Sequence, residues 1–239
     1  MSSMYGDRAP LYDLLYSFKN YAAEADALHD RLQALGLEDG ARLLDGGCGS
    51  GLHLEQLARW YQVSGFDLSA DMIALAKKRL PNAPLWQDNL ASFQVEEPVD
   101  AAVCLFSAIG YLLEEASLRS CAAAFHRALR PGGLLLVEPW LAPAIFRPGR
   151  PFAQSHMDAD VALSRVSMSS REGDISVLTM AWTVARRDQP EIEQFVEEQR
   201  LWLCPPDLLE RVFQEAGFDA AIEWPGLATG RGLLVGRRR

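Results

Sequence analysis

The chain has few cysteines and few histidines, and neither residue type gathers into a recognisable site. Its four cysteines, Cys48, Cys104, Cys121 and Cys204, show no CxxC spacing, and only four histidines accompany them. Such scattered residues favour neither a zinc site nor a disulfide framework. We therefore expect no bound metal and a reducing compartment, the cytoplasm.

Basic residues are also outnumbered, and long apolar runs are missing. Lys and Arg total 23 against 32 Asp and Glu, which gives a formal net charge of −9. Nucleic-acid backbones are bound through clustered Lys and Arg, and the terminal 237–239 is only a short basic cluster of three arginines. No run approaches the roughly 20 apolar residues of a membrane span, and no signal peptide is recognisable. We expect neither a nucleic acid nor a membrane as partner.

The chain does contain short apolar segments that alternate with longer amphipathic ones. With 239 residues, of which 49% are hydrophobic, it can bury the core of one domain or of one elaborated domain. Short apolar runs predict strands at 42–45, 63–67, 84–87, 100–106 and 134–138. Amphipathic runs predict helices at 20–35, 52–61, 70–80 and 114–129. This βαβ order predicts an α/β fold with a doubly wound, Rossmann-like parallel sheet.

The pattern changes in the C-terminal half. Segments 161–170 and 175–184 alternate apolar and polar residues around the turn-like Glu172-Gly173-Asp174, which predicts inserted antiparallel strands within 152–202. A helix at 206–216 and strands at 220–224 and 232–236 then rejoin the main sheet. We therefore divide the chain into a ligand-binding core with an N-terminal lid (1–140), an inserted β platform (141–203) and a return to the core (204–239). The platform could cover a pocket or pair with a second subunit.

Glycine is concentrated directly after the first predicted strand, in the sequence LLDGGCGSG. A buried strand is weakened by so much glycine, so Gly46, Gly47, Gly49 and Gly51 indicate a sharp turn that a ligand approaches closely. In doubly wound sheets such ligands lie at the carboxyl ends of the strands, against the N-terminus of the next helix.

Two acidic residues end the following strands. Asp67 lies roughly 20 residues beyond the glycines, where a carboxylate can accept the hydroxyl groups of a ribose. Asp88 ends the third strand and is placed to meet an adenine edge. The sequence therefore predicts a nucleoside-containing ligand.

Four segments together resemble the successive motifs of class I S-adenosylmethionine-dependent methyltransferases. They are DGGCGSG (45–51), GFDLS (65–69), QDN (87–89) and LRPGG (129–133). Dinucleotide-dependent dehydrogenases usually carry a third glycine where this chain has Leu52, so methyl transfer is favoured over hydride transfer. The resemblance implies S-adenosylmethionine as the cofactor.

Further segments are similar to the N,N-dimethyltransferases that act on TDP-linked amino-deoxysugars in desosamine and mycaminose biosynthesis. These segments are 4–5, 11–14, 19–25, 106–112, 137–140, 165–167, 170–173 and 230–233. The similarity runs nearly end to end. It implies a small-molecule acceptor, dimethylation of its amino group and a homodimer.

The resemblance also implies a set of cofactor contacts. They are Tyr12, Lys19, Tyr21, Asp45, Gly46, Gly47, Gly49, Gly51, Asp67, Leu68, Met72, Asp88, Asn89, Leu105, Phe106 and Ser107. Plainer interpretations stay open for some of them: Asp45 could cap the turn, Met72 could be a core residue, and Tyr12 and Tyr21 could be ordinary helix aromatics.

On the acceptor side, the resemblance implies Tyr5, Trp140, Arg165, Arg171 and Arg231. Guanidinium groups suit a diphosphate better than ammonium groups do. Without that role, the three arginines would be solvated residues of strands or turns. Arg231, which lies between two glycines, is the strongest candidate.

The chemistry needs positioning above all, because a sulfonium is a good leaving group for an amine held in line. Tyr111, Glu138 and Tyr5 are candidate catalytic residues that orient or deprotonate this amine, and the sequence does not decide between the two roles. His53 and His126 are expected to be structural. Two other functions stay open: methylation of another small natural product, and cofactor binding without turnover, which the intact glycine loop disfavours.

Overall fold

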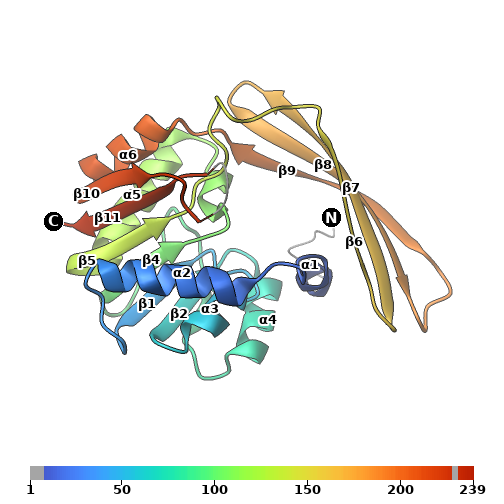
Figure 1. Cartoon of the computed structure of the whole chain (residues 1–239), viewed down its shortest axis with the longest axis horizontal. Helices are drawn as coiled ribbons and strands as arrows, with labels where there is room; N and C mark the ends of the chain where they lie inside the picture. Colours follow the sequence, from blue (N-terminus) through green and yellow to red (C-terminus); the bar gives the residue numbers. More distant parts are fainter. Residues whose placement is uncertain (1–7, 228–230) are drawn as a thin grey trace.

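The computed structural model describes residues 8–227 and 231–239, and its main body is a seven-stranded sheet (Figure 1). Its strands are β1 (Arg42–Gly46), β2 (Gln62–Asp67), β3 (Leu85–Gln87), β4 (Val99–Cys104), β5 (Leu129–Val137), β10 (Phe218–Glu223) and β11 (Leu233–Arg238). They lie in the order β10-β11-β5-β4-β1-β2-β3, with β1 to β5 parallel and β11 antiparallel to both neighbours. The predicted α/β fold is confirmed.

Helices cover both faces of this sheet. They are α2 (Tyr21–Ala34), α3 (Leu52–Leu57), α4 (Ala70–Arg79), α5 (Glu115–Ala128) and α6 (Pro206–Glu215). Because side chains alternate along a strand, Leu43 faces the core under α2, α3 and α4, whereas Leu44 faces the core under α5 and α6. The strands are thus buried on both sides, and their carboxyl ends meet at one edge.

A second sheet contains the predicted antiparallel insertion. It is formed by β6 (Pro151–Met157), β7 (Val161–Glu172), β8 (Ile175–Arg186) and β9 (Glu193–Trp202), each antiparallel to the next. The β7–β8 turn lies where it was predicted, with Glu172 opposite Ile175 and Gly173 at a φ of 59°. The proposed division of the chain at residues 140 and 203 stays a prediction.

A helix that the sequence did not predict, α1 (Ala9–Leu15), lies between the two sheets (Figure 1). Its Leu11 and Leu15 are buried against Leu163, Met180 and Trp182 of the second sheet. At seven residues it is too short for a recognisable helical period. Its stability comes instead from apolar partners far away in the sequence.

Several predicted boundaries are wrong, among them the start of the fifth strand, which lies at Leu129 rather than at 134. The fourth strand ends at Cys104 rather than at 106, because Phe106 (φ 50°) and Ser107 (φ 63°) adopt left-handed backbone and lead into the short 3-10 helix η1 (Ala108–Tyr111). The helix after the glycine loop ends at Leu57, since the chain then turns and buries Tyr61 against His29. In the described part of the chain, no helix has the length and apolarity to cross a membrane.

Candidate active site

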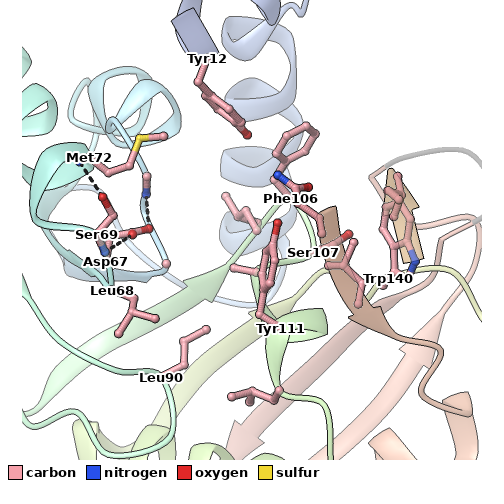
Figure 2. Close-up of a pocket in the computed structure, with 18 of the residues that line it drawn as sticks. Tyr12, Asp67, Leu68, Ser69, Met72, Leu90, Phe106, Ser107, Tyr111 and Trp140 are labelled. Atoms are coloured by element: carbon pink, nitrogen blue, oxygen red, sulfur yellow. Dashed lines mark hydrogen bonds between the residues drawn. The ribbon is translucent and has the colours of Figure 1, made fainter. Parts of the chain in front are cut away.

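A cavity of about 1450 Å³ lies at the carboxyl ends of the parallel strands and extends to the inner face of the four-stranded sheet. Sixteen residues predicted for the site line it (Figure 2): Tyr12, Lys19, Gly47, Gly49, Asp67, Leu68, Met72, Asp88, Asn89, Leu105, Phe106, Ser107, Tyr111, Trp140, Arg165 and Arg231. Residues from both halves of the chain thus surround one space.

The glycine loop enters this cavity at two of its four glycines. At Gly47 a Cβ atom would lie 2.6 Å from the Cβ of Ala108, so only glycine lets η1 approach. Gly49 has a φ of 56°, which favours glycine. Gly46 and Gly51 were predicted as cofactor contacts but do not line the cavity, because they pack against Phe125 and α4 respectively.

Asp67 connects the glycine loop to the next helix. Its Oδ2 accepts the N–H of Gly49 at 2.9 Å, and its Oδ1 accepts the N–H of Ser69 at 2.8 Å. Ser69 in turn caps α4 by accepting the N–H of Met72 (Figure 2). Burial raises the pKa of Asp67, although these backbone donors act in the opposite direction. Each carboxylate oxygen has a second lone pair, which a ribose hydroxyl group can use.

Asp45 lies behind the loop rather than on the cavity wall. It is 2% exposed, and its Oδ1 has no hydrogen-bond partner among the residues that the structure describes. Burial, followed by the charge of Asp67, raises the pKa of Asp45 to about 8. Because an orphaned buried carboxyl oxygen is stabilised by an arriving cation, this site fits the ammonium group of the expected cofactor.

Next to Asp67, the cavity is lined by the apolar side chains of Leu68 and Met72 and by the polar Asp88. Leu68 is 66% exposed at its rim, while Met72 is buried at its base, so Met72 is both a core residue and a cavity residue. Asp88 is fixed by donors from Trp86 Nε1 (3.2 Å) and the N–H of Asn89 (2.8 Å). Apolar faces with a polar edge suit an adenine ring, so together with Asp67 and Asp45 the residues present fit S-adenosylmethionine.

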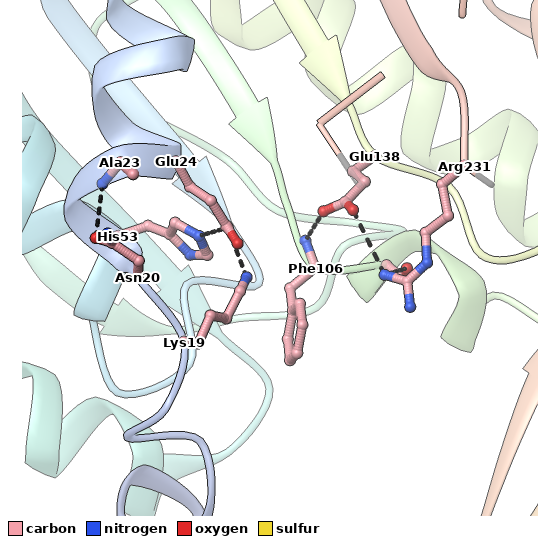
Figure 3. Close-up of polar contacts among 9 residues, drawn as sticks. Lys19, Asn20, Ala23, Glu24, His53, Phe106, Glu138 and Arg231 are labelled. Carbon is pink, nitrogen blue, oxygen red and sulfur yellow. Dashed lines mark hydrogen bonds and ion pairs between the residues drawn. The ribbon is translucent and has the colours of Figure 1, made fainter. Parts of the chain in front are cut away.

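A polar clamp holds the left-handed turn at Phe106 and Ser107 (Figure 3). Oε2 of Glu138 accepts the N–H of Phe106 at 2.7 Å, and its Oε1 lies 3.4 Å from Nη1 of Arg231. The same Nη1 donates to Ser107 Oγ at 3.0 Å, and the guanidinium lies 4.7 Å from the ring centre of Trp140. Glu138 is 3% exposed and does not line the cavity. Its carboxylate is thus committed to the clamp.

The other two predicted arginines differ sharply. Arg165 is 8% exposed and donates to Tyr16 Oη (3.0 Å) and Gln154 Oε1 (3.1 Å). No carboxylate within the described ranges forms an ion pair with it. Arg171 is exposed at the β7–β8 turn, where it donates to the carbonyl of Gly173 and pairs with Asp174. The structure therefore does not bring Arg171 to the cavity, contrary to the prediction.

Some of the predicted tyrosines line the cavity and others do not. Figure 2 shows the hydroxyl ends of Tyr12 and Tyr111 directed into the cavity from opposite sides. Burial raises the pKa of Tyr12 well above its usual value, which keeps its hydroxyl group neutral. Tyr21 does not line the cavity and packs edge-on against His53. Tyr5 lies outside the described residues.

Comparison with known proteins agrees with this geometry. Residues 43–133 match the family model of a methyltransferase domain. The chain is 36% identical over 234 residues to the dTDP-3-amino-3,6-dideoxy-alpha-D-glucopyranose N,N-dimethyltransferase of Streptomyces fradiae, covering 97% of this chain and 91% of the relative. The chain belongs to the TDP-aminosugar N,N-dimethyltransferase family. It is an S-adenosylmethionine-dependent methyltransferase.

A further relative methylates a different position. The methyltransferase is 34% identical to the dTDP-4-amino-2,3,4,6-tetradeoxy-D-glucose N,N-dimethyltransferase of Saccharopolyspora spinosa, over 99% of this chain and 95% of the relative. Among solved structures, DesVI of Streptomyces venezuelae has a TM-score of 0.90 at 35% identity, covering 98% of this chain and 99% of that chain. CalS10 of Micromonospora echinaspora, an amino pentose methyltransferase solved with S-adenosylmethionine bound, has a TM-score of 0.84 at 33% identity, covering 96% and 97%.

The cavity of the methyltransferase is also lined by residues that were not predicted from the sequence, among them Tyr16, Glu24, Gln154 and Met180. Glu24 lies inside the segment 19–25 on which the resemblance rested, so its charge was a usable signal. Gln154 faces Arg165 across β6 and β7, a pairing that depends on strand register. Strand register was not part of the prediction. The sequence analysis therefore missed Gln154 as a lining residue on the acceptor side of the cavity.

Proposed function

We propose that the methyltransferase transfers two methyl groups in succession to the amino group of a TDP-linked deoxysugar. The observation that carries this proposal is the continuous cavity, which joins the cofactor residues to a wall formed by the second sheet. The full-length relatives act on dTDP-aminosugars by their names, and they support the same acceptor class. Such an enzyme would serve the biosynthesis of an aminosugar-bearing antibiotic.

Arg165 is the proposed binding residue for the diphosphate. A buried guanidinium without a carboxylate partner is costly, and a diphosphate offers the charge and the planar oxygen pairs that it matches. Arg231 shares its charge with Glu138 and is proposed to contact the sugar side of the acceptor with Trp140. Arg171 donates to the carbonyl of Gly173 at an exposed turn, so we do not include it among the residues that bind the acceptor.

The proposed catalysis depends on positioning. Bound S-adenosylmethionine supplies a methyl group on a positively charged sulfur. The chain contributes two tyrosine hydroxyl groups, from Tyr12 and Tyr111, that flank the space in which the amine would lie. Glu138 fixes the turn below them, and Tyr5 is proposed to close over the acceptor. Removing one such orienting group is expected to slow turnover by about 10- to 100-fold.

The acceptor class is tested with the purified enzyme and S-adenosylmethionine. TDP-3-amino and TDP-4-amino deoxysugars are compared with phenol and carboxylate acceptors, and product mass is followed over time. Successive gains of one and two methyl groups on an aminosugar are expected. Methylation of only the phenol or carboxylate acceptors would refute the proposal and favour a different small natural product as substrate.

We further propose that two copies of the chain pair through the outer face of the four-stranded sheet. In one row across this face, Ala153, Val166, Ala181 and Val196 lie side by side and are all exposed. The two neighbouring rows are Pro151, Met168, Thr179 and Glu198, and Ser155, Ser164, Thr183 and Gln194. A nearly uncharged sheet face of small side chains suits pairing with an identical face.

Sedimentation velocity tests this pairing. The parent is expected to be a dimer, and Val166→Glu, which places a carboxylate in the central row, is expected to be a monomer. A monomeric parent would refute the proposed interface.

Finally, we propose a cytoplasmic location, which the free state of all four cysteines supports.

A further inference from the structure

A fully buried serine connects the second sheet to Trp140 on the acceptor side of the cavity. Ser176 of β8 is 0% exposed. Its Oγ accepts the Nε1–H of Trp140 at 2.8 Å and donates to the carbonyl oxygen of Leu201 at 3.0 Å. Leu201 lies directly opposite Ser176 where β8 pairs with β9. One hydroxyl group thus joins the indole of Trp140 to the backbone of a neighbouring strand.

Ser176 is a polar residue on an otherwise apolar stretch of β8. Because side chains alternate along a strand, Ser176 shares one face of β8 with Leu178 and Met180. Those two residues line the cavity, whereas Ser176 does not. A buried hydroxyl group is costly unless it is hydrogen-bonded, and the bonds to Trp140 and Leu201 meet that requirement. Ser176 therefore acts on the cavity only through its neighbours.

Packing alone does not enclose Trp140. This residue lines the main cavity and also borders a second cavity of about 10 Å³, together with Cys204 and Trp224. The second cavity has room for about one water molecule. Since Trp140 borders open space in two places, the hydrogen bond to Ser176 restrains the indole where side-chain packing does not.

The position of this indole decides the surroundings of a cavity arginine. The guanidinium group of Arg231 lies 4.7 Å from the ring centre of Trp140, which is a favourable distance for a cation over an aromatic face. Figure 2 shows Trp140 and Asp67 on opposite sides of Tyr111. The contact between Trp140 and Arg231 is thus on the acceptor side, away from the nucleoside side of the cavity.

The two partners of Ser176 also support the short helix η1. A Cβ atom at Gly110 would lie 3.1 Å from the Cβ of Trp140 and 3.0 Å from Cδ2 of Leu201, so η1 packs closely on both residues. The next residue of η1 is Tyr111, whose hydroxyl group is directed into the cavity. Ser176 therefore connects the residues on which the acceptor side of the cavity is built.

We propose that Ser176 is a positioning residue for acceptor binding, which holds the indole of Trp140 against Arg231. Its hydrogen bond sets the affinity for the acceptor and leaves cofactor binding unchanged. The inference rests on the proposed function, because that function assigns Trp140 and Arg231 to the acceptor. The competing explanation is a hydrogen bond that stabilises the fold without affecting the acceptor.

Steady-state kinetics of a double-mutant cycle separates these explanations. Ser176→Ala is expected to raise the acceptor KM by about tenfold, with kcat changed by less than about threefold and the Kd of S-adenosylhomocysteine by less than about twofold. In Trp140→Phe, which has no indole N–H, adding Ser176→Ala is expected to change KM by less than about twofold. Ser64→Ala is the matched control, since Ser64 is also a strand serine that donates to the carbonyl of a neighbouring strand, at Leu43, but lies outside the cavity. Its acceptor KM is expected to equal that of the parent.

A second pair of variants keeps the test valid if Ser176→Ala does not fold. Ser176→Thr and Ser176→Val introduce side chains of the same shape that differ only in the hydroxyl group. The threonine variant is expected to have an acceptor KM within about threefold of the parent, and the valine variant a KM about tenfold higher than the threonine variant. In heteronuclear NMR spectra, the indole N–H signal of Trp140 is assigned by its absence from Trp140→Phe. This signal is expected to shift and to exchange faster with water in Ser176→Val, but not in Ser176→Thr.

Three results would overturn the proposal. The first is a lower Tm with an unchanged acceptor KM in both Ser176→Ala and Ser176→Val, and the second is an equal rise in KM in the parent and Trp140→Phe backgrounds. The third is an indole signal of Trp140 that is the same with and without the hydroxyl group. Failure of the proposed function is recognised separately, because the parent would then methylate other acceptors and no aminosugar. The KM ratios are in that case measured with the acceptor that the parent methylates, and the indole signal needs no acceptor.

Discussion

The clamp at Glu138 allows orientation and proton transfer to be separated experimentally. Glu138→Ala removes the acceptor of the buried Phe106 N–H, which costs about 1 to 3 kcal/mol. It also leaves Arg231, whose side chain is 18% exposed, without its carboxylate. Because the Arg231 side chain is partly accessible to water, we use the lower end of the range of about 3 to 5 kcal/mol for breaking a buried ion pair. Together these two costs give an expected loss of about 4 kcal/mol in the free energy of unfolding, or roughly 8 to 16 °C in Tm for a chain of this size.

Glu138→Gln separates the two roles. Its amide oxygen can still accept the Phe106 N–H, so the left-handed turn is kept and only the charge opposite Arg231 is lost. We expect about 1 kcal/mol of destabilisation and a roughly tenfold fall in kcat, compared with about 100-fold for Glu138→Ala. Thermal unfolding, calorimetry of cofactor binding and steady-state rates on the acceptor supply the comparison. If Gln and Ala lower kcat equally while both bind cofactor like the parent, Glu138 accepts the proton and the clamp interpretation fails.

Three further perturbations follow from the cofactor side of the site. Asp13 accepts hydrogen bonds from Ser50 Oγ (2.5 Å) and Arg79 (2.9 Å) and so connects α1 to the glycine loop. Asp13→Asn should raise the cofactor Kd, measured by calorimetry, by about tenfold. An unchanged Kd would show that α1 does not restrain the loop. The pKa of Asp45 is raised from 3.8 to about 8, so the folded protein keeps a proton that the unfolded chain releases, and stability falls as pH rises from about 4 to about 8. Asp45→Asn should flatten that fall in urea unfolding of cofactor-free protein, and an unaltered pH dependence would contradict the raised pKa. Gly47→Ala combines a φ of 80° with a 2.6 Å contact and should cost about 2 to 4 kcal/mol; a loss under 1 kcal/mol in the same assay would show that the loop relaxes freely.

The acceptor wall shows where sequence reasoning reached its limit. Arg165 and Arg171 are six residues apart on β7, so both side chains have the same alternation parity along the strand. A separation of six residues is about 20 Å along a strand. Only the position of α1 and the core opposite β7 decides that one arginine is buried beside the cavity while the other is exposed at the turn. No property of the two residues themselves distinguishes them.

The sequence by itself determined the cofactor half of the protein, because its signals are local. A glycine loop between strand and helix, with Asp67 at the next strand end, needs only short-range turn geometry and the right-handed βαβ connection to form a site. The acceptor half depends on contacts that are distant in the chain. Glu138 and Arg231 are 93 residues apart, and α1 becomes a stable helix only against the second sheet. Tertiary packing decided which charges were paired with one another and which were left for a ligand, since burial and partner distance set the cost of each charge.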